Sequence, residues 1–267
     1  MSQATVGTLV RAEFKKISST RLWWGLLLGA VVWTILWALL TAGFAGVDPG
    51  GGQPTSPGLD TAEGIRGVYA TASFTGAYIF AMILGISGMT GEYRYQTITS
   101  TFLVYPKRTL VVWAKMIAHL GMGLVFGLVA VVTAISAGGV VIVIRGFDLG
   151  FGSEDLWTSV GLGVVAVAIW TLMGIGIGTL IRNQIAAILV AVFITFLLEP
   201  LLTFGLNAAD FGDVAKYLPT TASSALLSPA ELGFAYLDWW QGGLVLAAYA
   251  LLFAGLGTLL SLRRDVS

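Results

Sequence analysis

Six long apolar stretches constrain this chain more than any other feature. Crossing about 30 Å of hydrocarbon takes roughly 20 apolar residues in a helix that rises about 1.5 Å per residue. The sequence offers six stretches of at least that length, at 22–44, 67–90, 116–144, 156–181, 184–206 and 241–262. We therefore predict one all-α transmembrane domain over 1–267, a polytopic membrane protein with six transmembrane helices.

The low share of charged residues supports this prediction. Only 10% of the residues are charged, whereas a soluble domain carries roughly 25%. A transmembrane β-barrel would show apolar segments of about half the observed length with alternating polarity, and the chain does not. The first stretch is too long for the apolar part of a cleaved signal peptide and is expected to stay as a helix. Without cysteines, the chain can form neither disulfides nor thiolate metal sites.

The basic residues set the predicted orientation. With both termini in the cytoplasm, the outer side keeps only Arg66, Arg145 and Lys216 of the fourteen basic residues, and the other eleven lie inside. These eleven are Arg11, Lys15, Lys16, Arg21, Arg94, Lys107, Arg108, Lys115, Arg182, Arg263 and Arg264. Cytoplasmic segments carry such an excess of Lys and Arg. We expect a multi-pass protein of the cell membrane with cytoplasmic termini.

The segment before the first span, 1–21, has the pattern of an amphipathic helix. Val6, Val10, Phe14 and Ile17 recur at helical spacing, with basic residues beside and opposite them. Such a helix is expected to lie in the inner interface with its cations near anionic headgroups. Two interpretations stay open, a surface anchor alone or an anchor that also contacts a cytoplasmic partner.

The segment between the fifth and sixth spans is expected to dip back into the outer leaflet. Glu199 and Pro200 are predicted to break the fifth apolar run, and residues 207–240 alternate apolar patches with acids and prolines. Irregular backbone at membrane depth has to be buried in protein or line a cavity, so short re-entrant helices fit best. Glycines at helical spacing in the spans predict closely packed helices; the pairs are Gly25 and Gly29, Gly123 and Gly127, and Gly174 and Gly178.

Few residues could carry chemistry. No Gly-Lys dipeptide exists, which excludes a phosphate-binding loop, and a single histidine excludes multi-histidine metal sites. His119 is interpreted as a polar residue of the bundle or interface, with a proton relay as the alternative. Glu199 either accepts hydrogen bonds where Pro200 leaves a backbone gap, or lines an outer vestibule that contacts a cationic substrate. We expect no enzyme activity and no cofactor in this chain.

The strongest motif is the basic segment 91–115 between the second and third spans. It contains the run GEYRYQTITSTFLVYPKR and ends on Ala-Lys. The positive-inside rule accounts for its cations but not for Glu92 or for the aromatic and hydroxyl residues. A short helix at 97–105, stopped by Pro106, would present Phe102 and Leu103 to whatever lies below it.

This segment resembles the cytoplasmic loop of ABC-2 type transporter permeases, particularly actinobacterial members similar to drug-efflux proteins. The basic N-terminus, the six spans and the Tyr-Leu-Pro-Thr stretch before the last span agree with that resemblance. The residues that match the loop pattern are Glu92, Arg94, Thr97, Pro106, Arg108 and Lys115. Gln96 departs from the pattern, because the family often has glycine there. The resemblance implies that 91–115 contains a coupling helix docked on a separate ATPase, with Phe102 and Leu103 at the contact.

Together these features predict the permease subunit of an ATP-binding-cassette exporter. Two permease subunits, identical or related, would enclose the pathway, and two ATPase subunits with ATP and Mg would drive alternating access. The resemblance implies a drug, antibiotic or lipid as the substrate and no nucleic acid as a partner. A gradient-driven secondary transporter and an ATP-independent membrane scaffold are the alternatives. The first would need titratable or ion-binding residues at mid-membrane, which are nearly absent from this sequence. The second leaves the Glu92 to Lys115 pattern unexplained.

Overall fold

The computed structural model of the chain describes residues 6–48, 56–97, 108–227 and 236–263. Helices and the turns between them make up these residues, with no strand among them. The elements are α1 (Val6–Ser19), α2 (Leu22–Phe44), α3 (Ala62–Arg66), the π-helix η1 (Gly67–Thr71), α4 (Ala72–Arg94), α6 (Arg108–Ile144), α7 (Glu154–Leu180), α8 (Gln184–Phe193), the π-helix η2 (Ile194–Leu198), α9 (Glu199–Ala208), α10 (Gly212–Ala215), α11 (Pro219–Leu226) and α12 (Trp239–Arg263). For these residues the prediction of an all-helical chain is confirmed.

Five helical runs among the described residues are long and apolar enough to cross a membrane. They are Leu22–Phe44, Ala62–Arg94, Thr109–Ile144, Glu154–Leu180 and Gln184–Ala208. The sixth apolar helix is α12, whose 25 residues span about 37 Å. Helix α6 begins eight residues before the predicted third span, and its 37 residues reach about 55 Å, more than the hydrocarbon needs.

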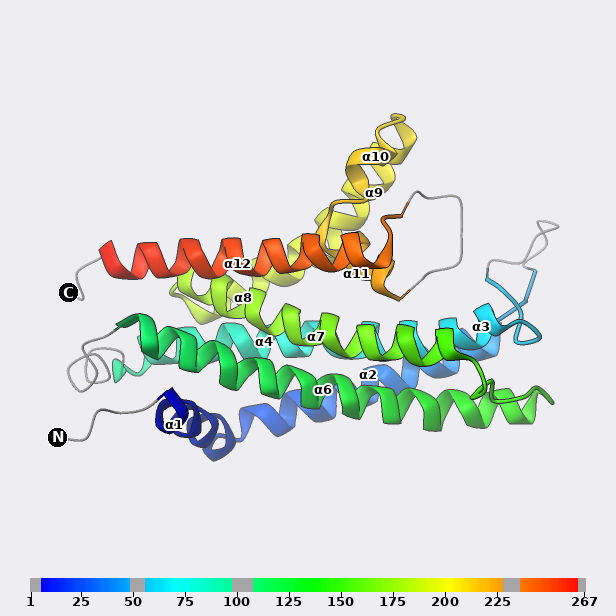
Figure 1. Cartoon of the computed structure of the whole chain (residues 1–267), viewed down its shortest axis with the longest axis horizontal. Helices are drawn as coiled ribbons and strands as arrows, with labels where there is room; N and C mark the ends of the chain where they lie inside the picture. The colour runs from blue at the N-terminus through cyan, green and yellow to red at the C-terminus, as the bar shows by residue number, and fades with distance from the viewer. Residues whose placement is uncertain (1–5, 49–55, 98–107, 228–235, 264–267) are drawn as a thin grey trace.

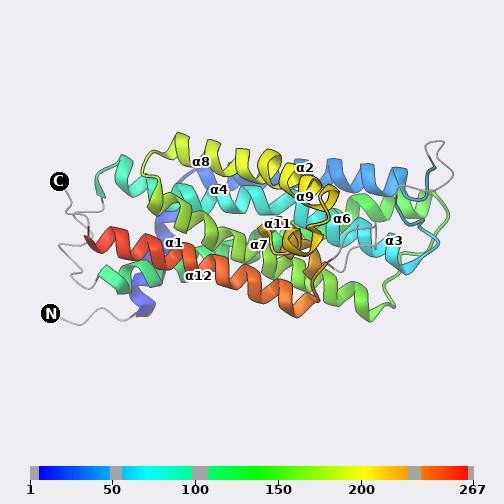
Figure 2. The ribbon, with the colours of Figure 1, turned by 90° about the horizontal axis from the view of Figure 1, so that it is seen from above.

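Helix α4 lies at the centre of the bundle. It packs against α7, α2 and α6. In the run Ala62–Arg94, which contains α4, 78% of the most apolar stretch is buried, compared with 22% in α2. A Cβ added at Gly85 of α4 would overlap the carbonyl of Thr171, and one at Gly174 of α7 would overlap the carbonyl of Met82. The two backbones therefore touch where these glycines face them, as small residues permit in membrane helices. Figure 2 shows α4 between its neighbours along the length of the bundle.

The predicted close approach holds for most of the glycine pairs. Gly123 and Gly127 lie against the α7 backbone, Gly178 lies against α4, and Gly29 faces the ring of Phe80. Gly25 faces open space instead, so spacing alone did not identify its role.

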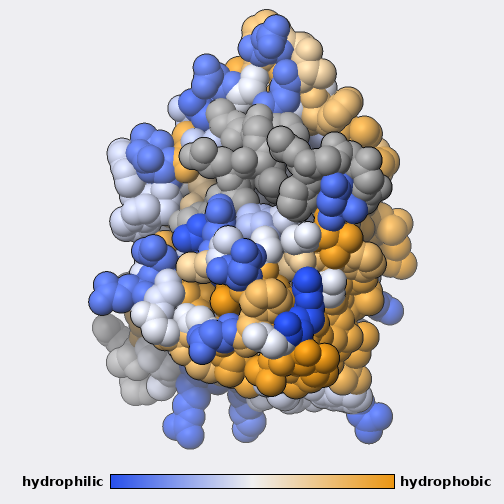
Figure 3. All heavy atoms as spheres, turned by 90° about the vertical axis from the view of Figure 1, so that its right-hand side faces the viewer, coloured by the Kyte–Doolittle hydropathy of each residue, from blue (hydrophilic) through white to orange (hydrophobic). Residues whose placement is uncertain are grey.

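The bundle has two distinct ends (Figure 1). One end, called the α1 end here, holds α1, the C-terminal ends of α4 and α12 and the N-terminal end of α6. The other, the α3 end, holds α3, the C-terminal ends of α2 and α6 and the N-terminal end of α7. Seen from the α3 end, hydrophilic residues cover much of the end face and hydrophobic ones gather on its flank, as expected of a helix bundle in lipid (Figure 3).

The fifth run does not stop at Pro200, contrary to the prediction. Proline lacks the N–H for the preceding helical turn and its ring crowds the carbonyl four residues earlier. The chain widens into the π-helix η2 just before Glu199, and Pro200 then occupies the first turn of α9, where its N–H is not needed. Helix α9 and α10 rise away from the bundle, while α11 packs beside α12 (Figure 1).

Candidate functional site

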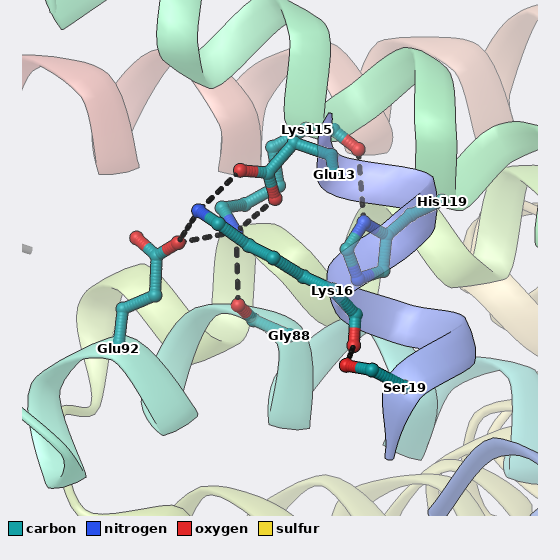
Figure 4. A network of polar contacts seen from close by, with 7 residues as sticks. All are labelled: Glu13, Lys16, Ser19, Gly88, Glu92, Lys115 and His119. Carbon is teal, nitrogen blue, oxygen red and sulfur yellow. Dashed lines mark hydrogen bonds and ion pairs between the residues drawn. The ribbon is translucent and has the colours of Figure 1, made fainter. Parts of the chain in front are cut away.

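A buried cluster of charged side chains joins three helices at the α1 end. Lys115 of α6 is 3% exposed and uses all three N–H groups of its ammonium. Its Nζ donates to Glu13 Oε2 of α1 at 2.7 Å, to Glu92 Oε1 of α4 at 3.0 Å and to the Gly88 carbonyl at 3.1 Å. Figure 4 shows the ammonium between the two carboxylates. One cation therefore connects α1, α4 and α6.

A second cation completes the cluster. Lys16, one turn beyond Glu13, donates to Glu13 Oε1 at 2.6 Å and to Glu92 Oε1 at 3.0 Å. Two lysines thus face two carboxylates, and the formal charges cancel. Buried charges carry a desolvation cost that only good geometry and further hydrogen bonds offset. Here each ammonium contacts both carboxylates, so the cluster is balanced and closed (Figure 4).

The cluster shifts the pKa values of its two residues on α1, Glu13 and Lys16. Burial pushes the pKa of Glu13 up, but the charge and hydrogen bonds of Lys115, helped by Lys16, outweigh it and hold the pKa below the ordinary 4.5. For Lys16 burial pushes the pKa down, and the hydrogen bond and charge of Glu13 and the charge of Glu92 raise it above the ordinary 10.5. Both groups are therefore charged across the physiological range.

His119 lies one turn from Lys115 and is fully buried. Its Nδ1 lies 2.9 Å from the Lys115 carbonyl, and because a carbonyl only accepts, Nδ1 carries the proton. The Nε2 atom is then an acceptor, and it finds no partner among the described residues. A Cβ added at Gly88 would overlap Nε2, so the glycine makes room for the imidazole next to the cluster. This geometry agrees with the interpretation of His119 as a hydrogen-bonded residue of the bundle.

The end of α4 is also tied to the start of α8. Arg94 Nη1 contacts Gln184 Oε1 at 3.4 Å, and Gln184 Nε2 donates to Ser87 Oγ at 3.2 Å. The guanidinium of Arg182 lies 5.3 Å from the ring centre of Tyr93, in the geometry of a cation–π contact. The last turn of α4 therefore contacts α1 and α6 on one side and the α7–α8 junction on another.

The half of the bundle toward the α3 end, which the sequence predicts to be the outer half, contains a cavity of about 740 Å³ between α2, α4, η2 and α11, open on one side. We call it the outer cavity. Both π-helices contribute to its wall, η1 through Val68 and Thr71 and η2 through Thr195 and Phe196. Ligand sites in proteins commonly measure about 300–1,000 Å³ and are lined by apolar and aromatic groups with a few polar ones. A second cavity of about 310 Å³ adjoins it and shares four lining residues, Pro200, Thr220, Ser224 and Tyr236.

Glu199 connects two parts of the cavity wall. The carboxylate is 4% exposed, and its Oε2 accepts from the Thr220 backbone N–H at 2.8 Å and from the Thr220 hydroxyl at 2.6 Å. Thr220 belongs to the first turn of α11, where backbone N–H groups have no partner within the helix. Glu199 therefore fixes α11 to the start of α9. Its partner lines both cavities, whereas Glu199 is not among the lining residues described.

Comparison with known proteins then decides the family. The family model described as "ABC-2 family transporter protein" matches residues 9–198, well over half of the chain. The chain belongs to the ABC-2 transporter family. It is a membrane-spanning permease of that family, in agreement with its apolar helices. A comparison with individually curated proteins found no match to this permease.

The structure brings together only some of the predicted coupling residues of the permease. Glu92 and Lys115 meet in the cluster, while Arg94 contacts Gln184 instead. Thr97 is exposed at the end of the described part of the segment. Phe102, Leu103, Pro106 and the body of the predicted helix at 97–105 lie outside the described residues, and Arg108 begins α6.

The one departure from the loop pattern is Gln96, and the backbone there adopts a conformation that suits glycine. Its φ is +54°, in the left-handed region that glycine adopts at little cost and other residues adopt rarely. The backbone of this permease therefore keeps the conformation that a glycine would favour, with glutamine in its place.

Sequence reasoning missed Glu13 as a site residue. The buried face of α1 consists of Leu9, Glu13 and Ile17, spaced four apart, whereas Val6 and Phe14 of the predicted stripe are 43% and 37% exposed. The signal was present in that spacing, because a carboxylate in line with buried apolar residues requires a cationic partner. Identifying Lys115 as that partner required the fold.

Proposed function

We propose that this permease is the membrane subunit of an ATP-binding-cassette exporter. The α1 end faces the cytoplasm, where a separate ATPase that binds ATP and Mg docks beneath segment 91–115. Two permease subunits enclose the pathway, and the substrate is a hydrophobic or amphipathic drug, antibiotic or lipid. The excess of basic residues at the α1 end supports this orientation.

The buried cluster is the observation that carries the proposal. Glu92 and Lys115 stand at the two ends of segment 91–115, and their contact closes the segment at its base. Glu13 joins α1 to the same point. A push on the segment is therefore received by α1, α4 and α6 as one unit, because breaking the cluster would leave buried charges without partners.

The connection continues toward the outer cavity through α8. Arg94 and Arg182 hold the end of α4 against the α7–α8 junction, and the run from α8 through η2 supplies Thr195 and Phe196 to the cavity wall. A tilt of α4 and α8 would reshape the cavity. Nucleotide-driven closure of the ATPases supplies the free energy, because a change of state requires a ligand with different affinities for the two states.

The first experiment is co-purification of the tagged chain from mild detergent, with mass spectrometry of the accompanying proteins. The proposal expects a nucleotide-binding subunit in stoichiometric amount, retained at moderate salt. Recovery of the chain alone, with and without nucleotide and at several salt concentrations, would contradict it.

Glu92→Gln tests the coupling role within that complex. The amide keeps the shape of the side chain but removes one of the two negative charges facing Lys115 and Lys16. We expect the complex to assemble, while ATP hydrolysis loses most of its dependence on the permease. Glu154→Gln, at the start of α7 near the other end of the bundle, is the matched control. Wild-type coupling in Glu92→Gln would show that the cluster has no part in transmission.

A further inference from the structure

The described residues that line the outer cavity include an acidic side chain but no basic one. Among the described residues that line it, Glu63 of α3 is the only charged one, and the other polar groups are hydroxyls, an indole and tyrosine rings. Glu63 is 43% exposed at the side chain, with Arg66 as a distant partner at 4.0 Å. Glu63 lines the cavity, and Arg66 is not among the described lining residues.

A cation at the end of α6 near the cavity, Arg145, is bound by backbone carbonyls. Arg145 donates from Nη1 to the carbonyls of Ala42 at 2.8 Å and Ala45 at 2.9 Å, at the end of α2, and lies over the ring of Phe147. It binds the last turn of a helix, where partial negative charge gathers, and is not among the described lining residues. The described lining residues therefore offer a ligand one carboxylate and neutral groups, with no lining cation that could pair with an anion.

Aromatic rings form a continuous row on one wall. Phe74 stacks on Tyr78 with ring centres 4.7 Å apart, and Tyr78 in turn faces Phe196 at 6.5 Å. All three rings line the cavity. The stacked faces of these rings cover one another, and Phe196, which is 44% exposed, is the ring of the row most open to a ligand. An aromatic ring attracts a cation at its face, and the attraction grows where water is displaced. A flat apolar surface with this row beside it also suits the aromatic groups of a ligand.

We infer that the outer cavity binds lipophilic organic cations that carry aromatic rings, and discriminates against anions of the same shape. This assignment rests on the proposed export function for its purpose, but the binding preference belongs to the cavity alone. The ring row receives the apolar body and the diffuse positive charge, and Glu63 at the α3 side of the cavity adds the long-range attraction. A volume of about 740 Å³ accepts a molecule of drug size.

Two ions of nearly identical shape and opposite charge test this inference: tetraphenylphosphonium and tetraphenylborate. The full-length chain is placed in lipid nanodiscs, with any subunit that co-purifies, and saturable binding of each ion is measured after subtraction of empty discs. We expect saturable binding of the cation and at least tenfold weaker binding of the anion. Glu63→Gln should weaken the cation by about five- to tenfold and leave or improve the anion.

Two further variants keep the test decisive. Phe196→Leu removes an exposed ring of the row and should weaken the cation about threefold. Glu154→Gln, an acid that does not line the cavity, should change neither ion. Saturable binding that favours the anion, no saturable binding of either ion, or a Glu63→Gln variant with unchanged affinity for the cation would overturn the inference. Each of these results would leave co-purification of an ATPase, and with it the proposed function, untouched.

Discussion

The two polar regions of this permease, the charged cluster at the α1 end and the outer cavity, differ in what their polar groups contact. At the α1 end, charged side chains contact each other, the charges cancel and all three N–H groups of Lys115 are used. At the outer cavity, one carboxylate and a row of rings face an open space. In the charged cluster every carboxylate and ammonium already has a partner of opposite charge, so the cluster resists separation of its helices. A cavity that is open on one side and lined by one carboxylate among neutral groups can accept a ligand, but it contributes little to holding the helices together.

Removing Lys115, the central cation of the cluster, should give the largest effect on stability among the variants proposed here. Lys115→Met keeps an unbranched side chain, one atom shorter, but leaves Glu13 and Glu92 buried with only Lys16 between them. Loss of one partner from a buried ion pair costs about 3–5 kcal/mol. We expect a large drop in the thermal unfolding midpoint in detergent and poor recovery of the folded chain.

The triple variant Lys115→Met, Glu13→Gln, Glu92→Gln separates charge from packing. It removes the uncompensated acids along with the lysine, so much of the lost stability should return. A triple variant as unstable as Lys115→Met would mean that the contacts of the lysine stem, rather than the charges, hold the three helices.

The pH dependence of α1 docking follows from the same cluster. The folded pKa of Glu13 lies below 4.5, so its contribution is complete above 4.5 and is lost as the pH falls through the folded value. The folded pKa of Lys16 lies above 10.5, so its contribution is complete below 10.5 and is lost as the pH rises through the folded value. Docking should therefore be constant between about pH 5 and pH 10 and weaken outside that window.

Spin labels can measure this window directly, because the chain has no cysteine. Ser18→Cys on α1 and Trp113→Cys on α6 place labels at exposed positions of the two helices. The distance distribution between them should stay narrow through neutral pH and broaden in acid. Broadening between pH 6 and pH 8 would contradict the assignment of Glu13 as an ionised partner.

The spans could be predicted because apolar length is a local property of the sequence. The stretch that became α2 ends at the residues expected, since a run of 23 residues with a mean hydropathy of 2.1 leaves few alternatives in lipid. The effect of Pro200 could not be judged in the same way. Proline disfavours a regular helix, but a π turn and a position in the first turn of α9 let the helix continue.

The cluster and the cavity were predicted only in part, because each depends on residues far apart in the chain. Glu13 and Lys115 are 102 positions apart, and no spacing rule connects them. Glu92 was singled out because plain charge topology did not require it, and the structure then supplied its partners. The cavity joins residues from α2 to α11, so its existence follows from the packing of α4 against its neighbours.

The smallest effect should come from Glu199, on the open side of the comparison. Its carboxylate makes two hydrogen bonds to Thr220 and no ion pair among the described residues. Glu199→Gln can still accept through its amide oxygen, so the change replaces charge-assisted bonds by neutral ones and costs about 1 kcal/mol. Hydrogen exchange at the Thr220 amide should accelerate about fivefold while the amides around Lys115 exchange as before. Equal acceleration at both ends would mean that the two regions unfold as one unit, and the contrast between a closed cluster and an open cavity would then fail at the level of stability.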